Sequence, residues 1–192
     1  MKLAPANTAL PLCLLLLLLA ACAGMPDHFY TLNTLPVTAA TPPAAPTTAV
    51  HLNVTVPSLV DRSEMVLSTS KSGVAILDHE RWAAPLSDQV AQTLARDIER
   101  QRGDLLVGDR RFDRPAPPPV SLRVDIVRLT AQRAGEASME AHWRIIDAGA
   151  DRLGSGSFAA AVNGGDYAAV AQAYSQLLRE LAEKLAADIA RR

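Results

Sequence analysis

Alternation of apolar and polar residues along the chain predicts a set of extended segments. In 50–56, 120–126 and 139–145, apolar side chains occupy every second position, which is the pattern of a strand with one face against a core. A further segment, 153–162, follows a turn at 147–151, so the last three strands are expected to form an antiparallel meander. Shorter strands are predicted at 29–32, 65–70, 74–77 and 105–107, with 65–70 and 74–77 joined as a hairpin through Lys71-Ser72-Gly73.

Two segments switch to a period close to four and predict helices. The first carries an apolar residue at every fourth position over 86–98 and is expected to run for about 16 residues, from Pro85 to Gly103. The second carries a wide apolar stripe over 170–189, with Asp166 as its N-cap. Together the elements predict an α/β (α+β) sandwich, in which two long helices pack on a mixed, mostly antiparallel sheet. The pattern leaves open whether both helices lie on one face.

Three stretches break these patterns and are expected to be loops. Residues 36–49 include four Pro, five Ala and four Thr, a composition that favours coil or polyproline II. Residues 109–119 combine near-balanced charges with four prolines, which favours a solvated loop. Asp78-His79-Glu80 places three polar residues between the predicted hairpin and the first helix, where a loop is the default.

The N-terminus has the layout of a secretory signal peptide. An apolar run of eight residues, 12–19, follows a short segment with Lys2 as its basic side chain. A membrane-spanning helix needs about 20 apolar residues, so this run is too short to span. Cys22 follows Leu19-Ala20-Ala21, an arrangement that resembles the lipobox of bacterial lipoproteins. The alternative is that Cys22 is one more small residue in a signal cleaved nearby.

The lipobox resemblance implies that residues 1–21 are removed and that Cys22 carries the lipid anchor. Ala23, rather than Asp, then favours the outer membrane by the lipoprotein sorting rule. Residues 22–28 would form a tether and 29–192 a single domain. If 29–32 pairs in the sheet, the folded part lies within ~20 Å of the bilayer at ~3.3 Å per residue; otherwise the tether extends through Ala49.

Charge and cysteine content exclude several function classes. The predicted mature chain keeps 18 of the 19 Lys and Arg against 20 Asp and Glu, so no basic surface for nucleic acid is expected. Cys13 leaves with the signal and Cys22 is lipidated, which leaves the folded part without a disulfide or a thiolate metal site.

Candidate catalytic residues are few. Ser68 and Lys71 fit a Ser-x-x-Lys pattern, but the companion motifs Ser-Asp-Asn and Lys-Thr-Gly of penicillin-recognising enzymes are absent from the sequence. The four histidines lack the spacing of a metal site, and they are His28, His51, His79 and His142. We therefore predict no catalytic residues, no metal and no cofactor.

Three short motifs carry a resemblance to a known family. They are Tyr30-Thr31-Leu32; Val56 and Pro57 with Asp61 and Arg62; and Arg81-Trp82-Ala83 with Pro85 and Leu86. In this order and spacing the chain resembles the ABC-type transport auxiliary lipoprotein family (PqiC/YmbA-like), whose members are encoded beside mammalian-cell-entry (MCE) lipid-transport proteins. Ala84 departs from the Glu usual in the family at that position.

The resemblance implies a non-enzymatic periplasmic lipoprotein on the outer membrane. It would dock an MCE protein for lipid transport between membranes and for envelope integrity, with a homo-oligomer possible. It also implies that Tyr30 lies inside the sheet, which favours the short tether. The runner-up is an outer-membrane lipoprotein that itself binds a lipid or small apolar ligand, and a third candidate is an envelope hydrolase.

Partner binding is predicted for residues that no core pattern requires. Asp61 and Arg62, together with Phe112, supply charge and an aromatic ring, the types that dominate interface hot spots. Trp82 is a further candidate. In structural terms alone, Asp61 and Arg62 would form a surface turn and Trp82 would pack over the start of the first helix.

Overall fold

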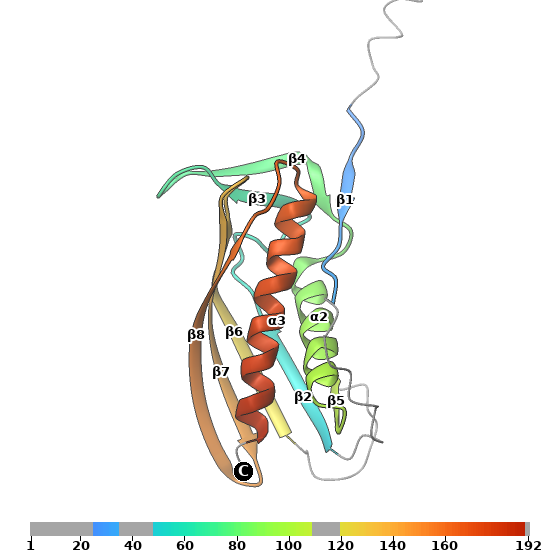
Figure 1. The fold of residues 1–192 in the computed structure, drawn as a ribbon, viewed down its shortest axis with the longest axis vertical. Coiled ribbons are helices and arrows are strands. Elements are labelled where there is room, and N and C mark those ends of the chain that lie inside the picture. The colour runs from blue at the N-terminus through green and yellow to red at the C-terminus, as the bar shows by residue number, and fades with distance from the viewer. Residues whose placement is uncertain (1–24, 35–47, 109–119, 191–192) are drawn as a thin grey trace, which may run out of the picture.

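The computed structural model describes residues 25–34, 48–108 and 120–190. A five-stranded sheet forms its larger part (Figure 1). Its strand order is β5 (Leu105–Gly108), β2 (Thr48–Thr55), β6 (Val120–Ala131), β7 (Glu136–Asp147) and β8 (Ala150–Ala161). The strands β5 and β6 run parallel to β2, whereas β6, β7 and β8 form the antiparallel meander.

A second, three-stranded sheet has the order β1 (His28–Tyr30), β4 (Val74–Trp82) and β3 (Glu64–Ser68). The strands β3 and β4 form the predicted hairpin, and β1 pairs with β4 in the parallel direction. The short segment that follows the N-terminal region is therefore part of the folded structure.

Two helices cover the same face of the five-stranded sheet and pack against each other (Figure 1). They are α2 (Leu86–Gln101) and α3 (Ala168–Ala190). The predicted N-cap is confirmed, because Asp166 Oδ1 accepts a hydrogen bond of 2.9 Å from the Ala169 N–H. Neither of these helices has the length and apolarity to cross a bilayer.

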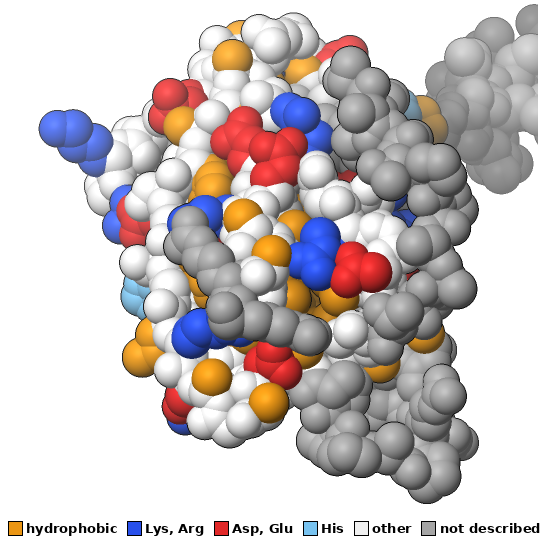
Figure 2. All heavy atoms as spheres, turned by 60° about the horizontal axis from the view of Figure 1, so that its bottom comes forward, with side chains coloured by type: hydrophobic (Ala, Val, Ile, Leu, Met, Phe, Trp, Pro, Cys, Tyr) orange, Lys and Arg blue, Asp and Glu red, His pale blue; other side chains and the backbone are white. Residues whose placement is uncertain are grey.

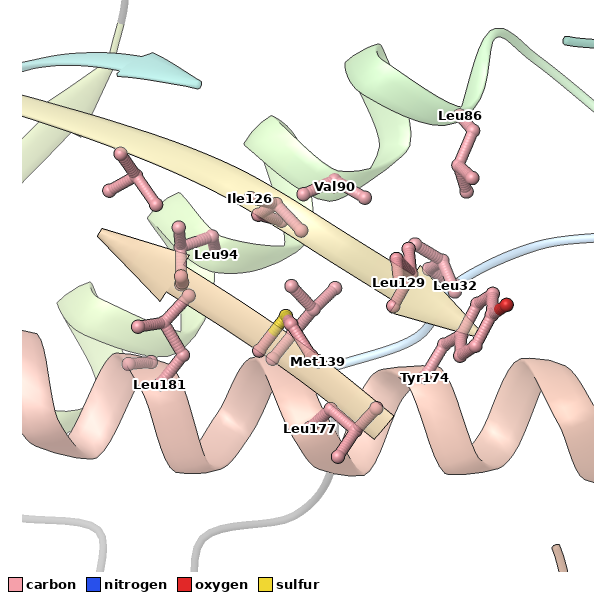
Figure 3. Packing of buried hydrophobic residues seen from close by; sticks show 14 of the residues in the cluster. Leu32, Leu86, Val90, Leu94, Ile126, Leu129, Met139, Tyr174, Leu177 and Leu181 are labelled. Carbon is pink, nitrogen blue, oxygen red and sulfur yellow. The ribbon is translucent and has the colours of Figure 1, made fainter. Parts of the chain in front are cut away.

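The core lies between the helices and the sheet, where the helical stripes meet the inward faces of the strands (Figure 3). Leu94 of α2, Leu181 of α3 and Met139 of β7 are almost completely buried there. Because each buried aliphatic side chain contributes roughly 1.5–3 kcal/mol, this layer is the main source of stability.

The α+β class with two long helices is confirmed, with one extension and one correction. The strands divide between two sheets, which alternation along one strand cannot reveal because it carries no information about partners. The prediction that Asp78-His79-Glu80 is a loop is wrong: all three residues belong to β4. The polar side chains of His79 and Glu80 are accommodated because Asp27 and the residues of β1 supply polar partners.

Candidate docking site

The family motifs meet at one end of the molecule, where β1, β4 and the start of α2 come together. Residues 57–63 form a compact loop there. The Pro57 carbonyl accepts hydrogen bonds of 3.0 Å and 3.1 Å from the N–H groups of Val60 and Asp61. Val60 is buried and holds the loop to the core, while Leu59 is exposed. The loop joins β4 through a 2.7 Å hydrogen bond from the Trp82 N–H to the Ser63 carbonyl.

Asp61 caps helix α2 from outside the helix. Its Oδ1 accepts a hydrogen bond of 3.0 Å from the Ser87 N–H in the first turn. The residue directly before α2 is Pro85, which has no polar side chain for this task. A carboxylate at a helix N-terminus both satisfies a free N–H and interacts favourably with the helix dipole.

Arg62 pairs with Glu64 rather than with its neighbour Asp61. Arg62 Nε donates to Glu64 Oε2 at 3.0 Å, and 39% of the Arg62 side chain remains exposed. Arg81 Nη2 lies 3.5 Å from the other Glu64 oxygen and also donates to Ser63 Oγ at 3.0 Å. The hydrogen bond from Arg62 lowers the pKa of Glu64, so the carboxylate stays ionised at neutral pH.

Side chains hold β1 to β4 on the inner side of the small sheet. Tyr30 donates its hydroxyl to Glu80 Oε2 at 2.5 Å, and His28 Nδ1 lies 3.1 Å from Glu80 Oε1. Burial and the Glu80 carboxylate raise the pKa of Tyr30 to about 12. Burial alone would raise the pKa of Glu80, but the hydrogen bonds from Tyr30 and His28 outweigh it and leave this pKa below its usual value.

The other side of the same strand pair carries a second set of contacts. Asp27 Oδ1 lies 3.0 Å from His79 Nδ1, and Asp27 Oδ2 lies 3.9 Å from Arg81 Nη1. Phe29 is opposite Arg81 in the strand register and has 63% of its surface exposed. We call the group formed by the exposed residues Phe29, Leu59 and Arg62 and the partly exposed Arg81 the tether-side surface.

The chain leaving β1 is fixed by both helices. The Leu32 N–H donates to Gln89 Oε1 of α2 at 2.9 Å, and the Asn33 N–H donates to Ser175 Oγ of α3 at 3.1 Å. Both polar side chains are buried. A buried polar group normally needs a hydrogen-bond partner, and here the partner is the backbone that follows β1.

Trp82 is buried, with an exposed fraction of 4%. Its ring stacks on Tyr174 of α3, with centroids 6.0 Å apart and planes 19° apart. Burial raises the pKa of Tyr174 above its usual value. Trp82 therefore locks the end of β4 onto α3 and positions the loop through its bond to Ser63.

The structure thus brings Asp61, Arg62 and Trp82 into one region, while Cys22 and Phe112 lie outside the described residues. Sequence reasoning did not select Glu80, Gln89 or Ser175. Ser175 carries a detectable signal, because it is a polar residue inside an otherwise apolar helical stripe. Gln89 is one of three polar residues, with Thr93 and Asp97, on the buried side of α2.

The residues of the Ser-x-x-Lys pattern, Ser68 and Lys71, lie at the end of a strand and in the turn that follows it. Ser68 ends β3, and the turn after it is closed by Ser70 Oγ, which accepts a 2.9 Å hydrogen bond from the Gly73 N–H. Within 25–34, 48–108 and 120–190, no three His, Cys, Asp or Glu side chains group in a way that could hold a metal ion. On the face drawn in Figure 2, the described acidic and basic side chains are interspersed.

Comparisons with known proteins agree with this architecture. A crystal structure of an uncharacterized protein matches with a TM-score of 0.72 and 16% identity, over 86% of this chain and 100% of that one. A Xanthomonas campestris protein of the family DUF330 matches with a TM-score of 0.56 and 20% identity, over 84% and 90%. At these identities the likeness concerns the fold. Comparison with curated protein sequences gives no match.

The chain shares its α+β fold with these structures. The family model of the ABC-type transport auxiliary lipoprotein component matches residues 30–186. The chain belongs to this family, which consists of lipoprotein components auxiliary to ABC-type transport and is not an enzyme family. Family membership indicates a lipoprotein of the cell envelope.

Proposed function

We propose that this protein is a non-enzymatic accessory subunit of an MCE/ABC-type (Pqi-like) lipid transport system. In this proposal a lipidated Cys22 anchors it to the periplasmic face of the outer membrane. The folded part docks the MCE protein and so supports lipid movement between membranes and envelope integrity.

The observation that carries the proposal is the position of β1. It begins at His28, six residues after Cys22, and pairs with β4, and the chain that follows it is fixed to both helices. An anchor at Cys22 would keep β1 within ~20 Å of the bilayer, since an extended chain spans ~3.3 Å per residue. A subunit held this close to a membrane is suited to presenting a docking surface at a fixed height.

For the docking surface we propose the tether-side surface together with Phe112. Arg62 and Arg81 offer guanidinium groups that are only partly engaged by Glu64 and Asp27, and Phe29 and Leu59 offer apolar contacts. Arginine and aromatic residues usually supply the largest share of interface energy. Asp61 and Trp82 contribute by holding the loop that carries Arg62.

The test measures capture of the MCE-type partner by this protein in detergent, titrated for wild type and variants. Arg62→Ala and Phe112→Ala are each expected to weaken capture by at least ~1 kcal/mol, the usual threshold for an interface residue that matters. The thermal melt should change little, because an exposed ion pair such as Arg62 with Glu64 contributes ~0–1 kcal/mol.

Arg128→Ala is the matched control, because Arg128 also forms an exposed ion pair, with Glu140 at 3.7 Å, but in β6 of the other sheet. Unchanged capture by both test variants would place the docking site elsewhere. Phospholipid bound at one molecule per chain in a native mass spectrum would instead favour a lipid-binding lipoprotein.

A further inference from the structure

The hairpin of β3 and β4 divides into a regular arm and an irregular base. Residues 65–68 pair with 74–77 in an uninterrupted antiparallel register, and the next pair, Glu64 with Arg81, follows only after a register shift. Strand β1 pairs with β4 from Glu80 onward. The other edge of β4 therefore has no described strand beside it at 74–77. We call residues 65–77 the hairpin arm.

Both strands of the hairpin arm are apolar at consecutive positions rather than at alternate ones. Strand β3 contributes Met65-Val66-Leu67, and β4 contributes Val74-Ala75-Ile76-Leu77. A continuous apolar run is the pattern of a strand that is covered on both faces, whereas alternation is typical of a strand with one solvated face. The sequence of the arm therefore indicates that both of its faces are covered.

The described residues cover only one face of the arm. Met65 and Leu67 point to one side and are buried in the core. On the other side, Val74 and Ile76 have 48% and 44% of their surface exposed, although Val66, which is opposite Ile76, is buried. The outward face of the arm thus presents two neighbouring aliphatic side chains to its surroundings.

The outward face of the five-stranded sheet provides an internal comparison. Its exposed positions in β6 and β7 are mainly charged or polar, and they include Arg123, Asp125, His142 and Arg144. Such a composition is expected of a sheet face in contact with water. The aliphatic outward face of the arm is not of this kind, which indicates that it contacts something other than water.

The arm lies at the end of the molecule where the N-terminal chain enters the fold. In Figure 1, β3 and β4 cross the end at which β1 begins. Met25, the first described residue, has 71% of its surface exposed and is three residues from Cys22. Three extended residues span ~10 Å. An anchor at Cys22 would therefore hold this end of the molecule next to the bilayer.

The turn of the arm carries groups that suit lipid headgroups. Thr69, Ser70, Lys71 and Ser72 are all exposed there, so hydroxyl groups surround one ammonium group. A lysine near a membrane surface is attracted to anionic lipids. Asp78, which is exposed directly after the arm, limits the apolar part to the positions near the turn.

The size of the apolar part favours a lipid surface over a protein as its partner. A stable protein interface buries about 800 Å² on each side, far more than two half-exposed aliphatic side chains provide. A membrane contact requires less, because aliphatic side chains enter only ~5–10 Å into the boundary between headgroups and acyl chains. At that depth the unpaired backbone edge of β4 remains among headgroups and water, where its N–H and C=O groups find partners.

We propose that the hairpin arm contacts the lipid surface of the membrane that carries the anchor, with Val74 and Ile76 below the headgroups and Lys71 at a lipid phosphate. This inference rests on the anchor at Cys22 proposed above. Because the anchor keeps the arm at a high effective concentration beside the bilayer, a weak contact is sufficient. The anchor and the arm together stop the folded part from turning about its tether, so the tether-side surface keeps one orientation.

The first test is fluorescence quenching in the full-length protein. The only cysteine expected in the mature chain is the lipidated Cys22, so Ile76→Cys accepts a fluorophore at a single thiol. The protein is reconstituted into vesicles of phosphatidylethanolamine and phosphatidylglycerol with a nitroxide on the acyl chains. Quenching at Ile76→Cys should be at least about twofold stronger than at Ser155→Cys, an exposed position on the large sheet, because the arm enters the acyl-chain boundary.

The second test changes the apolar side chains while the fluorophore is on Ser72→Cys in the turn. Val74→Thr with Ile76→Thr keeps two β-branched side chains and should weaken quenching at least about twofold, because hydroxyl groups replace aliphatic surface. Val127→Thr with Ile146→Thr is the matched control. These residues are 44% and 41% exposed on the large sheet, and their substitution should leave the quenching unchanged. Thermal melts verify that both double variants are folded.

Flotation of the vesicles separates this inference from the anchor on which it rests. Equal quenching at positions 76 and 155 in a protein that floats with the vesicles would overturn the arm contact and leave the anchor standing. The same conclusion would follow if both double variants were quenched like the wild type, or if the label at position 76 were shielded from an aqueous quencher but not reached from the acyl chains. A protein that does not float would overturn both. Capture of the MCE-type partner is measured separately, so the docking function and the arm contact can fail independently.

Discussion

At the scale of single residues, the need for glycine at position 154 comes from the aromatic ring that covers it. A Cβ atom at this position would lie 2.2 Å from Trp143 Nε1 and 2.4 Å from Cε2. Trp143 is buried and donates its N–H to Asp188 Oδ2 of α3 at 3.2 Å. The ring therefore has little room to move away from β8.

We expect Gly154→Ala to lower the free energy of unfolding by ~2 kcal/mol, within the ~1–3 kcal/mol typical of overpacking. Urea unfolding monitored by tryptophan fluorescence measures the change. Gly165→Ala is the control, because a Cβ there meets nothing within 4 Å. Equal stability of the two variants would show that the Trp143 ring shifts freely.

Asp97 is a buried acid between the two helices. Its side chain is 2% exposed, and neither carboxylate oxygen has a hydrogen-bond partner among the described residues. Burial raises its pKa to about 6, although Arg100 and Arg179 oppose the shift and Glu183 adds to it. The sequence shows the acid within the apolar stripe of α2 but cannot show how completely α3 covers it.

Asp97→Asn should stabilise the protein by ~1 kcal/mol at pH 7.5, because it removes an ionised group that lacks partners. The folded-state pKa lies above the ordinary value of 3.8, so the wild type gains stability as the pH falls from 6 towards 4. The advantage of the variant is therefore largest above pH 6 and disappears below about pH 4. Asp88→Asn, on the exposed side of α2, should lack this profile in chemical denaturation across the same pH range.

At the scale of elements, the start of α2 depends on a loop that is distant in sequence. Asp61→Ala is expected to cost ~1 kcal/mol, the usual value for a lost cap. Asp61→Asn retains an acceptor for the Ser87 N–H and should cost only a few tenths. Circular dichroism melts would measure the difference, with Arg62→Ala as a neighbouring variant that leaves the cap intact. A melt of Asp61→Ala that matches the wild type would mean that solvent replaces the cap.

The elements with a strong local period were predictable from sequence. Helices α2 and α3 and strands β6 and β7 follow directly from spacings of about four and two, and β8 was predicted from the turn that precedes it. The end of β4 was missed because Asp78, His79 and Glu80 interrupt the alternation. The partners of His79 and Glu80 are Asp27 and residues of β1, about 50 residues earlier, and such a pairing leaves no mark in the local pattern.

The candidate docking site was only partly predictable, for the same reason. The family motifs located Asp61, Arg62 and Trp82 in the sequence, but not the contacts that they make. Asp61 bonds to Ser87 and Trp82 stacks on Tyr174, both distant along the chain. The ion pair between Arg62 and Glu64 depends on the conformation of the loop, which the pattern of polar and apolar positions does not specify.

At the scale of the whole molecule, Cys22→Ser should change location without changing the fold. Cys22 lies outside the periodic segments of the sequence, so the substitution is expected to leave the core intact, whereas the proposed acyl chains would be lost. Each buried methylene contributes ~0.8 kcal/mol to membrane binding, so their removal should release the protein from the membrane fraction. Fractionation and a thermal melt test both expectations. A variant that stays in the membrane fraction, or melts far below the wild type, would contradict them.

The parallel pairing of β1 with β4 also determines how the fold bears mechanical load. Tension that arrives along the chain from the N-terminal side enters at His28 and acts along the strand axis. The bonds that join β1 to β4 are then sheared at the same time instead of opening one after another. Behind them, the Leu32 and Asn33 N–H groups are held by Gln89 and Ser175. A pull from this side is therefore distributed over both helices and the small sheet, so the side on which we propose the anchor is also a point of mechanical strength.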